Sequence, residues 1–220
     1  MSTLPVTPDP ASDTATDARK RVLPAKPKAA ALVALSFTLL LYLVELADVI
    51  LPGDLTQGGI HSRELSGLDG VLFAPVLHAG WSHLFANTVP VLLFSFLAMA
   101  AGIGRFALVT AIIWLVSGLG VWLIGPANAV TVGASGLAFG WLAYLLVRGI
   151  FNRAAGQILV AVVLLGIWSG MLLGLLPGNT GVSWQGHVFG ALAGVLAAWL
   201  TGRTGKSRKP APAATGNLGV

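Results

Sequence analysis

The sequence predicts an all-α fold: a polytopic membrane protein with six transmembrane helices and both termini in the cytoplasm. Hydrophobic residues make up 55% and charged residues 10% of the 220 residues, whereas about a quarter of the residues of a soluble domain are charged. The basic residues lie in short clusters between long apolar runs. We therefore interpret them as topology signals and not, despite a formal net charge of +5, as a nucleic-acid-binding face. The chain has no cysteine, which excludes thiolate catalysis, disulfides and Cys-based zinc sites.

Two tails flank the predicted membrane domain. Residues 1–28 are rich in Pro, Ala, Thr and Asp and lack apolar periodicity, which predicts a disordered cytoplasmic tail. The apolar run that follows is too long for a cleavable signal peptide and indicates a spanning anchor. Residues 29–202 then form the six-helix domain, and residues 203–220 form a second disordered tail, which is basic.

Six apolar stretches are candidates for the membrane spans, because about 20 mostly apolar residues cross a bilayer. The basic residues between them fall on one side of such a bundle, apart from Arg63, which lies beside acidic residues of the first outer loop. By the positive-inside rule that side is cytoplasmic, so the second, fourth and sixth helices run inward from the outer face. The predicted spans are 29–51, 83–101, 106–124, 135–147, 157–176 and 187–200.

The fourth and sixth helices are predicted to begin below the outer membrane surface. From Ser135 to the charge at Arg148 there are 13 residues, which span roughly 20 Å against a hydrocarbon core of about 30 Å. From His187 to Arg203 there are 16 residues, so His187 starts at a similar depth. The segment 125–134 must then descend into the membrane, where irregular backbone is tolerated only inside protein or along a wet cavity. We therefore expect a water-accessible cleft that opens to the outside.

Polar side chains gather near the outer end of the second helix. His83 and Asn87 are four residues apart, so they share one face of that helix. His78 precedes them in the loop, and Ser82 is predicted to cap the helix N-terminus. A purely structural alternative exists for each, because such side chains can equally tie the helix to a neighbouring loop.

Ser135, in G-A-S-G, and His187, in G-H-V-F-G, open the fourth and sixth helices. An ionisable side chain inside a membrane is a functional candidate, although a lone His near a membrane interface is more often structural. G-x-x-x-G faces at 136–140 and 190–194 allow the two helices to approach closely, with generic helix packing as the alternative. Such an approach would bring Ser135 within hydrogen-bond reach of His187, the geometry that an activated nucleophile requires.

The chain thus carries H-x-x-x-x-H-x-x-x-N at His78, His83 and Asn87, G-x-S-G at 133–136, and G-H-x-x-G at 186–190. Together, in this order and within a six-helix topology, these motifs resemble those of the rhomboid family of intramembrane serine proteases. The resemblance covers residues 29–200, nearly all of the chain outside the tails.

The resemblance implies a serine endopeptidase with a Ser-His dyad and no third carboxylate. Ser135 would attack the scissile carbonyl, and His187 would take its proton and return it to the leaving amine. The backbone N–H of Ser135 and side-chain donors from His83 and Asn87 would hold the tetrahedral oxyanion. The resemblance implies no cofactor and no metal.

The resemblance also implies that further residues support the site around Ser135 and His187. Gly133 lets the loop turn down to the serine, and Gly136 and Gly190 let the two helices approach. Phe139 stands where family members carry a residue that packs against the catalytic imidazole, with an ordinary apolar helix residue as the alternative. His78 resembles the family histidine that stabilises the first outer loop.

The resemblance also implies location and substrates. The protein would be a multi-pass protein of the cell membrane with its active site facing the extracytoplasmic side, and it would cut single-pass transmembrane proteins within the lipid bilayer. Gly166, Gly170 and Gly174 of the fifth helix suit either a lateral gate or simple packing. A Trp-Arg pair that many family members carry in the first outer loop is absent between Pro52 and Ser82, which leaves the role of that loop open.

Two other classes of function were weighed. A catalytically silent rhomboid-like protein would bind membrane clients, but such relatives generally lose the Ser or the His, and both are present here. A small transporter or a metal-binding membrane protein would use His78, His83 and His187. No H-E-x-x-H occurs, however, and no carboxylate accompanies these histidines. The leading prediction is therefore the intramembrane serine endopeptidase.

Overall fold

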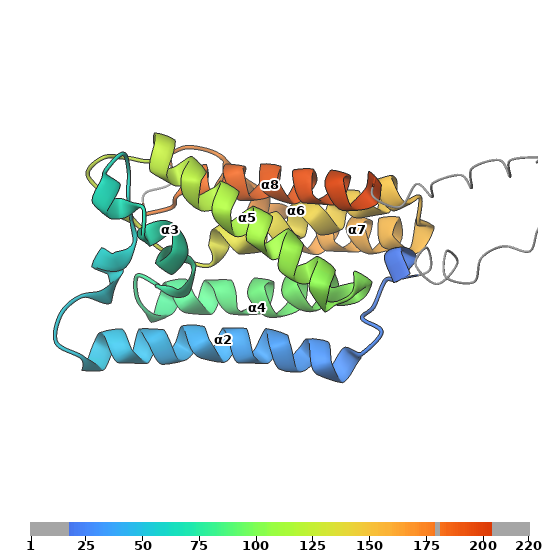
Figure 1. Ribbon diagram of the computed structural model, residues 1–220, viewed down its shortest axis with the longest axis horizontal. Coiled ribbons are helices and arrows are strands. Elements are labelled where there is room, and N and C mark those ends of the chain that lie inside the picture. Colours follow the sequence, from blue (N-terminus) through green and yellow to red (C-terminus); the bar gives the residue numbers. More distant parts are fainter. Residues whose placement is uncertain (1–17, 179–180, 204–220) are drawn as a thin grey trace, which may run out of the picture.

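Long helices, lying roughly side by side, form one bundle in this computed structural model, which describes residues 18–178 and 181–203 (Figure 1). Four apolar helical stretches are long and apolar enough to cross a membrane: Pro27–Ile50, Trp81–Ala101, Ile103–Ile124 and Ala155–Leu175. The chain is therefore a mostly helical, multi-pass membrane protein. The long helices are α2 (Pro27–Ile50), α4 (Trp81–Ala98), α5 (Ile103–Ile124), α6 (Ser135–Asn152), α7 (Ala155–Trp168) and α8 (Trp184–Arg203).

The outermost helix, α2, shows how such a sequence folds in lipid. Its buried side chains recur every three or four residues, which is the period of one helix face. Leucines such as Leu32 and Leu39 are about 60% exposed on the opposite side, as suits a helix whose other neighbour is hydrocarbon. The buried stripe consists of Ala30, Ala34, Thr38, Leu41 and Glu45.

Short elements cross the end of the bundle at which α2 finishes. A two-residue strand, β1 (Ile60–His61), pairs antiparallel with β2 (Val130–Thr131) and joins the first outer loop to the loop before α6. This pair is a small departure from the predicted all-α class. The same loop contains η1 (Leu55–Gly58), η2 (Leu65–Gly67), α3 (Gly70–Phe73) and η3 (Ala74–Val76). Two more short elements extend long helices: η4 (Met99–Ala101) follows α4, and η5 (Ser169–Leu175) follows α7.

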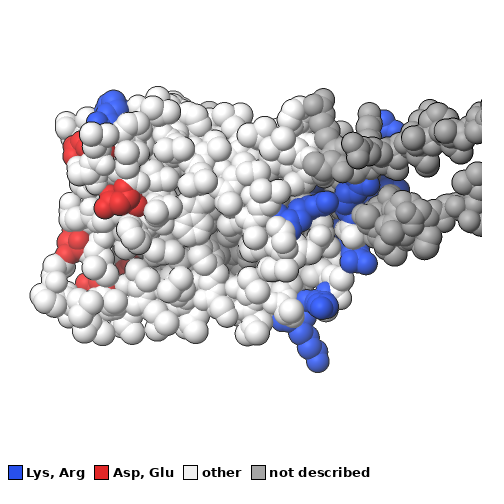
Figure 2. Space-filling view, viewed as in Figure 1, with Lys and Arg blue, Asp and Glu red and all other residues white. Residues whose placement is uncertain are grey.

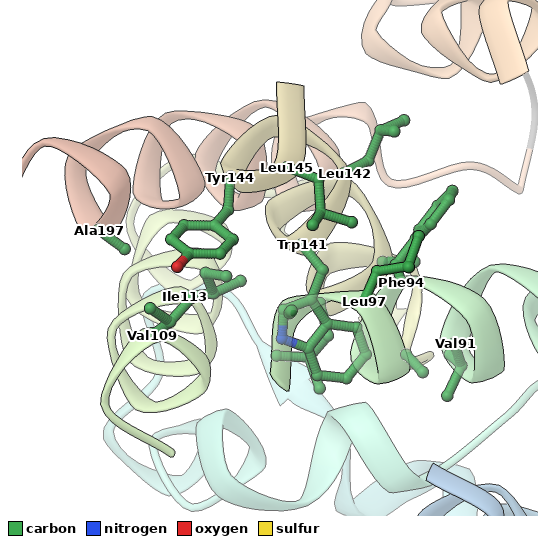
Figure 3. Packing of buried hydrophobic residues seen from close by; sticks show 14 of the residues in the cluster. Val91, Phe94, Leu97, Val109, Ile113, Trp141, Leu142, Tyr144, Leu145 and Ala197 are labelled. Atoms are coloured by element: carbon green, nitrogen blue, oxygen red, sulfur yellow. The ribbon is translucent and has the colours of Figure 1, made fainter. Parts of the chain in front are cut away.

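The hydrophobic core is built around α6, which contacts α4, α5, α7 and α8. Trp141 and Tyr144 of α6 are fully buried, and the Trp141 indole donates a hydrogen bond to Oγ1 of Thr110 on α5 (3.0 Å). Side chains of four helices converge there in Figure 3. They are Val91, Phe94 and Leu97 of α4, Val109 and Ile113 of α5, Trp141, Leu142, Tyr144 and Leu145 of α6, and Ala197 of α8.

Helices α6 and α8 contact each other through their glycines, as the two G-x-x-x-G faces predict. A Cβ placed on Gly190 would lie 2.2 Å from the carbonyl oxygen of Gly136, and one on Gly194 would lie 2.0 Å from that of Gly140. Real Cβ atoms never come so close to a backbone oxygen. The two backbones are therefore nearer to each other than any side chain at these positions would permit.

Two predictions about helix ends are wrong. Ser82 does not cap α4: that helix starts one residue earlier, and the N-cap is Gly80, whose φ of +96° suits a glycine. The fourth helix does not end before Arg148, because α6 continues to Asn152, and the guanidinium is buried, where it donates to the Leu97 carbonyl (3.2 Å). A carbonyl at the end of a helix needs such a donor, since it has no partner in its own helix.

The described part of the predicted N-terminal tail is fixed to the bundle. Nε2 of Gln157 donates to the carbonyls of Arg19 (2.7 Å) and Arg21 (2.9 Å), and Asn152 also donates to the Arg19 carbonyl (3.2 Å). α2 begins at Pro27, inside the segment expected to lack structure. The remainder of the two predicted tails, residues 1–17 and 204–220, lies outside the described residues.

The first outer loop is anchored by Arg63. Nη1 of Arg63 donates to the Gly125 carbonyl (2.7 Å), its backbone N–H donates to the Trp122 carbonyl (2.8 Å), and the Trp122 indole donates to the Glu64 carbonyl (2.7 Å). These carbonyls of residues 122 and 125 stand at the C-terminal end of α5, where a cation interacts favourably with the helix dipole. The loop is thus docked although it lacks the Trp-Arg pair.

We expect Gly194→Ala to destabilise the protein by at least about 1–3 kcal/mol, because the added methyl group would overlap a backbone oxygen that cannot rotate away. Gly166→Ala is the matched control: it also lies within a helix, and a Cβ there meets nothing within 4 Å. Because Ala favours helix over Gly, the control should unfold at or above the wild-type temperature. Thermal unfolding of the three proteins in one detergent measures both effects, and equal midpoints for the two variants would contradict the expectation.

Candidate active site

Ser135 is the first residue of α6, at the bottom of a turn that only glycine can make. Gly133 has φ of +120°, and a Cβ on it would lie 2.6 Å from the His83 ring. Its N–H donates to the Ala74 carbonyl (2.8 Å), and the N–H of Ala134 donates to Nε2 of His78 (3.4 Å). These bonds hold the loop at the start of α6. Measured from the end of the bundle at which α2 finishes, α6 begins deeper in the bundle than α5 ends (Figure 1).

His187 stands opposite Ser135 in the first turn of α8. Its Nε2 lies 2.9 Å from Oγ of Ser135, across 52 residues of sequence. The imidazole is buried, with 7% of its residue surface exposed. Oγ of Ser117 on α5 donates to the carbonyl of Gly186 (2.9 Å), which fixes the backbone immediately before the histidine. The structure thus brings together the two residues that the sequence paired.

The other contacts of His187 assign its tautomer. Nδ1 lies 2.8 Å from the Gly174 carbonyl oxygen, which can only accept a hydrogen bond. Nδ1 must therefore carry the proton, which leaves Nε2 as the acceptor for the Ser135 hydroxyl. The Phe139 ring stacks on the imidazole with 4.0 Å between ring centroids and 13° between planes. The side chain at 139 thus packs where the resemblance places it.

His83 and Asn87 present hydrogen-bond donors beside the serine. The backbone N–H of Ala79 donates to Nδ1 of His83 (3.4 Å), so the proton of the neutral ring is on Nε2, the atom that faces Gly133. The Asn87 amide donates one N–H to the His83 carbonyl (3.0 Å). Its second N–H, like the backbone N–H of Ser135, has no acceptor among the described residues. Three donors therefore surround one space.

That space is a cavity of about 600 Å³. Its polar lining includes His83, Asn87, Ser135 and His187, and much of its remaining wall is apolar. A cavity of this size with a few convergent polar groups is typical of a binding or active site. The apolar wall includes Pro90 of α4, Trp114 and Val121 of α5, Trp168 of α7 and Met171 of η5.

His78 does not belong to the cavity lining. It is buried in the connection before α4, with its ring centroid 5.1 Å from that of His83, and it accepts from the loop that carries Ser135. Burial, together with the nearby His83, lowers the pKa of His78 from 6.5 to about 4. A neutral ring in this position is an acceptor, which agrees with a supporting role.

The backbone carbonyl of Gly174 is a group of the site that the sequence does not predict. The Gly174 carbonyl orients His187, yet every residue has a carbonyl, and nothing in the sequence distinguishes this one. The glycine itself is one of three in the predicted fifth helix.

Among the described residues, no group of three or more His, Asp or Glu side chains could hold a metal ion.

The low pKa of His78 predicts acid sensitivity. Since the unfolded chain binds this proton near pH 6.5 and the folded chain only near pH 4, stability is full above pH 6.5 and falls as the pH drops toward 4. The loss amounts to about 3 kcal/mol for such a shift. His78→Gln keeps an acceptor for Ala134 without titrating, so its unfolding midpoint should vary less over this pH range. A slope equal to that of wild type would refute the assignment.

Comparison with known proteins places the chain in a family. It matches the Rhomboid domain over residues 66–204. Uncharacterized proteins of Mycobacterium bovis and Mycobacterium leprae are 51% and 48% identical to it over 174 residues, which cover 76% of this chain and 72% and 69% of theirs. The Bacillus subtilis protein named "Putative rhomboid protease YdcA" is 31% identical over 132 residues, 59% of this chain and 65% of its own.

The match to the family domain extends over more than half of the chain and includes Ser135, His187, His83 and Asn87 of the cavity described above. The chain belongs to the rhomboid family.

Proposed function

We propose that this protein is an intramembrane serine endopeptidase that uses Ser135 as nucleophile and His187 as general base. The observation that carries the proposal is the 2.9 Å contact between Oγ of Ser135 and an Nε2 that must accept, inside a cavity with unused donors. A serine is a weak nucleophile unless such a base lies within hydrogen-bond reach. Family membership supports the same reaction.

The geometry suits acyl transfer. His187 takes the hydroxyl proton as Oγ of Ser135 attacks the scissile carbonyl, and the resulting imidazolium protonates the leaving amine. The negative charge that develops on the carbonyl oxygen faces the N–H of Ser135, Nε2 of His83 and Nδ2 of Asn87. The N-terminus of α6 adds its positive dipole there. Water then hydrolyses the acyl-enzyme.

The distribution of charge supports an active site on the extracytoplasmic side. Figure 2 shows Lys and Arg at one end of the molecule and Asp and Glu, with a single basic group, at the other. By the positive-inside rule the basic end is cytoplasmic, and loop residues of the other end, among them Ile60, Pro126 and Ala129, line the cavity. With 18 and 20 residues, α6 and α8 are roughly 27 and 30 Å long. We therefore propose six spans with both termini in the cytoplasm.

The substrates that fit this site are single-pass transmembrane proteins. Between α4 and α7 the rings of Phe94 and Trp168 pack edge to face with their centroids 5.3 Å apart, and Trp168 lines the cavity. In the most apolar 18-residue window of the stretch Ala155–Leu175, only 11% of the residues are buried. A transmembrane segment in the surrounding bilayer can therefore reach the cavity laterally.

Ser135→Ala and His187→Ala should each reduce cleavage of a model transmembrane substrate by at least about 10⁴-fold, because neither half of the dyad works alone. Matched controls are Ser66→Ala, which alters another Ser-Gly pair, and His61→Gln, both in the first outer loop. Both controls should cleave like wild type. Labelling with a fluorophosphonate should modify wild type and not Ser135→Ala.

Cleavage by Ser135→Ala at the wild-type rate would refute the dyad. A wild-type protein that captures the transmembrane substrate in liposomes but neither cleaves it nor reacts with the fluorophosphonate would instead be a catalytically silent client-binding member of the family.

Asn87→Ala should lower kcat by about 10²–10³-fold with little change in KM, because an oxyanion donor acts mainly on the transition state. Thr88→Val is the control: Thr88 bonds to the carbonyl four residues before it as Asn87 does, but its hydroxyl contacts Tyr42 of α2. Steady-state cleavage kinetics separate the two parameters. An effect of Asn87→Ala confined to KM would show that Asn87 binds substrate rather than the oxyanion.

A further inference from the structure

A backbone carbonyl occupies the place at His187 that a carboxylate takes in a Ser-His-Asp triad. The Gly174 oxygen lies 2.8 Å from Nδ1, and Ser135 lies on the other side of the ring. In such a triad the carboxylate holds the imidazole in the correct tautomer and orientation. No Asp or Glu of the described chain bonds to His187.

The close approach requires glycine at 174. A Cβ there would lie 3.1 Å from Nδ1 of His187 and 3.0 Å from Cζ of Phe139, so a side chain would push the carbonyl away from the imidazole. Gly166 and Gly170 precede it on the same helical stretch, and a Cβ on either meets nothing within 4 Å. Of these three glycines, Gly174 is the one that contacts the site.

The segment that carries this carbonyl is loosely held. It belongs to η5, which has no buried residue and which extends α7 as a 3₁₀ helix, a form with poorer hydrogen-bond geometry than the α-helix. Met171 of η5 and Trp168 just before it also line the cavity. Segments with few buried contacts open at low free-energy cost. A substrate that enters beside α7 would therefore meet η5 before it meets Ser135.

We propose that the Gly174 carbonyl is a positioning group for His187 and that η5 thereby switches the catalytic base on and off. With η5 seated, Nδ1 holds the proton and Nε2 accepts from Ser135. With η5 displaced, Nδ1 loses its acceptor and the proton exchanges through water to Nε2, with no change in net charge. At Nε2 that tautomer cannot accept the serine proton, so the base works only while η5 is seated.

This inference rests on the proposed function for the role of His187, but its test does not require proteolysis. The protein contains four histidines, so ¹⁵N-histidine labelling gives a simple NMR spectrum, with His187 assigned by its absence in His187→Gln. In wild type, Nδ1 of His187 should show a directly bonded proton and Nε2 should not. A proton on Nε2 in wild type would overturn the inference whether or not the protein is a protease, and a variant serves only to assign the signal.

Gly174→Ala should shift His187 toward the tautomer with the proton on Nε2 and slow fluorophosphonate labelling of Ser135 at least about tenfold, since the wrong tautomer in a triad costs about 10⁴. Gly170→Ala is the matched control and should change neither. Phe139→Leu removes the stacked ring and leaves the carbonyl, so the proton should stay on Nδ1. An unchanged tautomer in a folded Gly174→Ala, or the same shift in Gly170→Ala, would overturn the inference.

Discussion

The backbone contact between α6 and α8 is the constraint on which the rest of the structure depends. Gly136 and Gly190 meet near one end of that contact, and Ser135 directly precedes Gly136 while His187 lies three residues before Gly190. Because the helices touch through backbone, the separation of the two backbones that carry Ser135 and His187 does not depend on intervening side chains. On the flank, α5 contributes Gly120, whose missing Cβ leaves room for the ring of Phe189. Contacts among α5, α6 and α8 thus fix the position of Ser135 relative to His187.

The site is organised by backbone groups rather than by charges. Carbonyls of Gly174 and Ala74 accept from His187 and from the turn before Ser135, and the free N–H of Ser135 faces the cavity. A carboxylate beside the imidazole would have to be desolvated, at a cost of several kcal/mol. A carbonyl imposes the same tautomer without a buried charge. This arrangement requires glycine at position 174, where the carbonyl must come close to the imidazole of His187.

The end of the bundle at which α2 finishes holds this arrangement in place. Arg63 joins the first outer loop to the end of α5, and the β1–β2 pair joins the same loop to the segment before α6. His78 also holds this segment, because its Nε2 accepts a hydrogen bond from the N–H of Ala134. The loop between α2 and α4 is therefore tied both to the end of α5 and to the segment that leads to Ser135.

The sequence by itself determined the features that depend on local pattern. Apolar runs located the long helices, G-x-x-x-G spacing located the α6–α8 contact, and the polar motifs named Ser135, His187, His83 and Asn87. It could not show that Arg148 is buried, because a lone charge in an apolar run resembles a surface marker until its carbonyl partner is known. Nor could it single out the Gly174 carbonyl, which is chemically identical to every other. Tertiary structure decided these points, because a backbone group acquires a specific role only when the fold places it against a particular side chain.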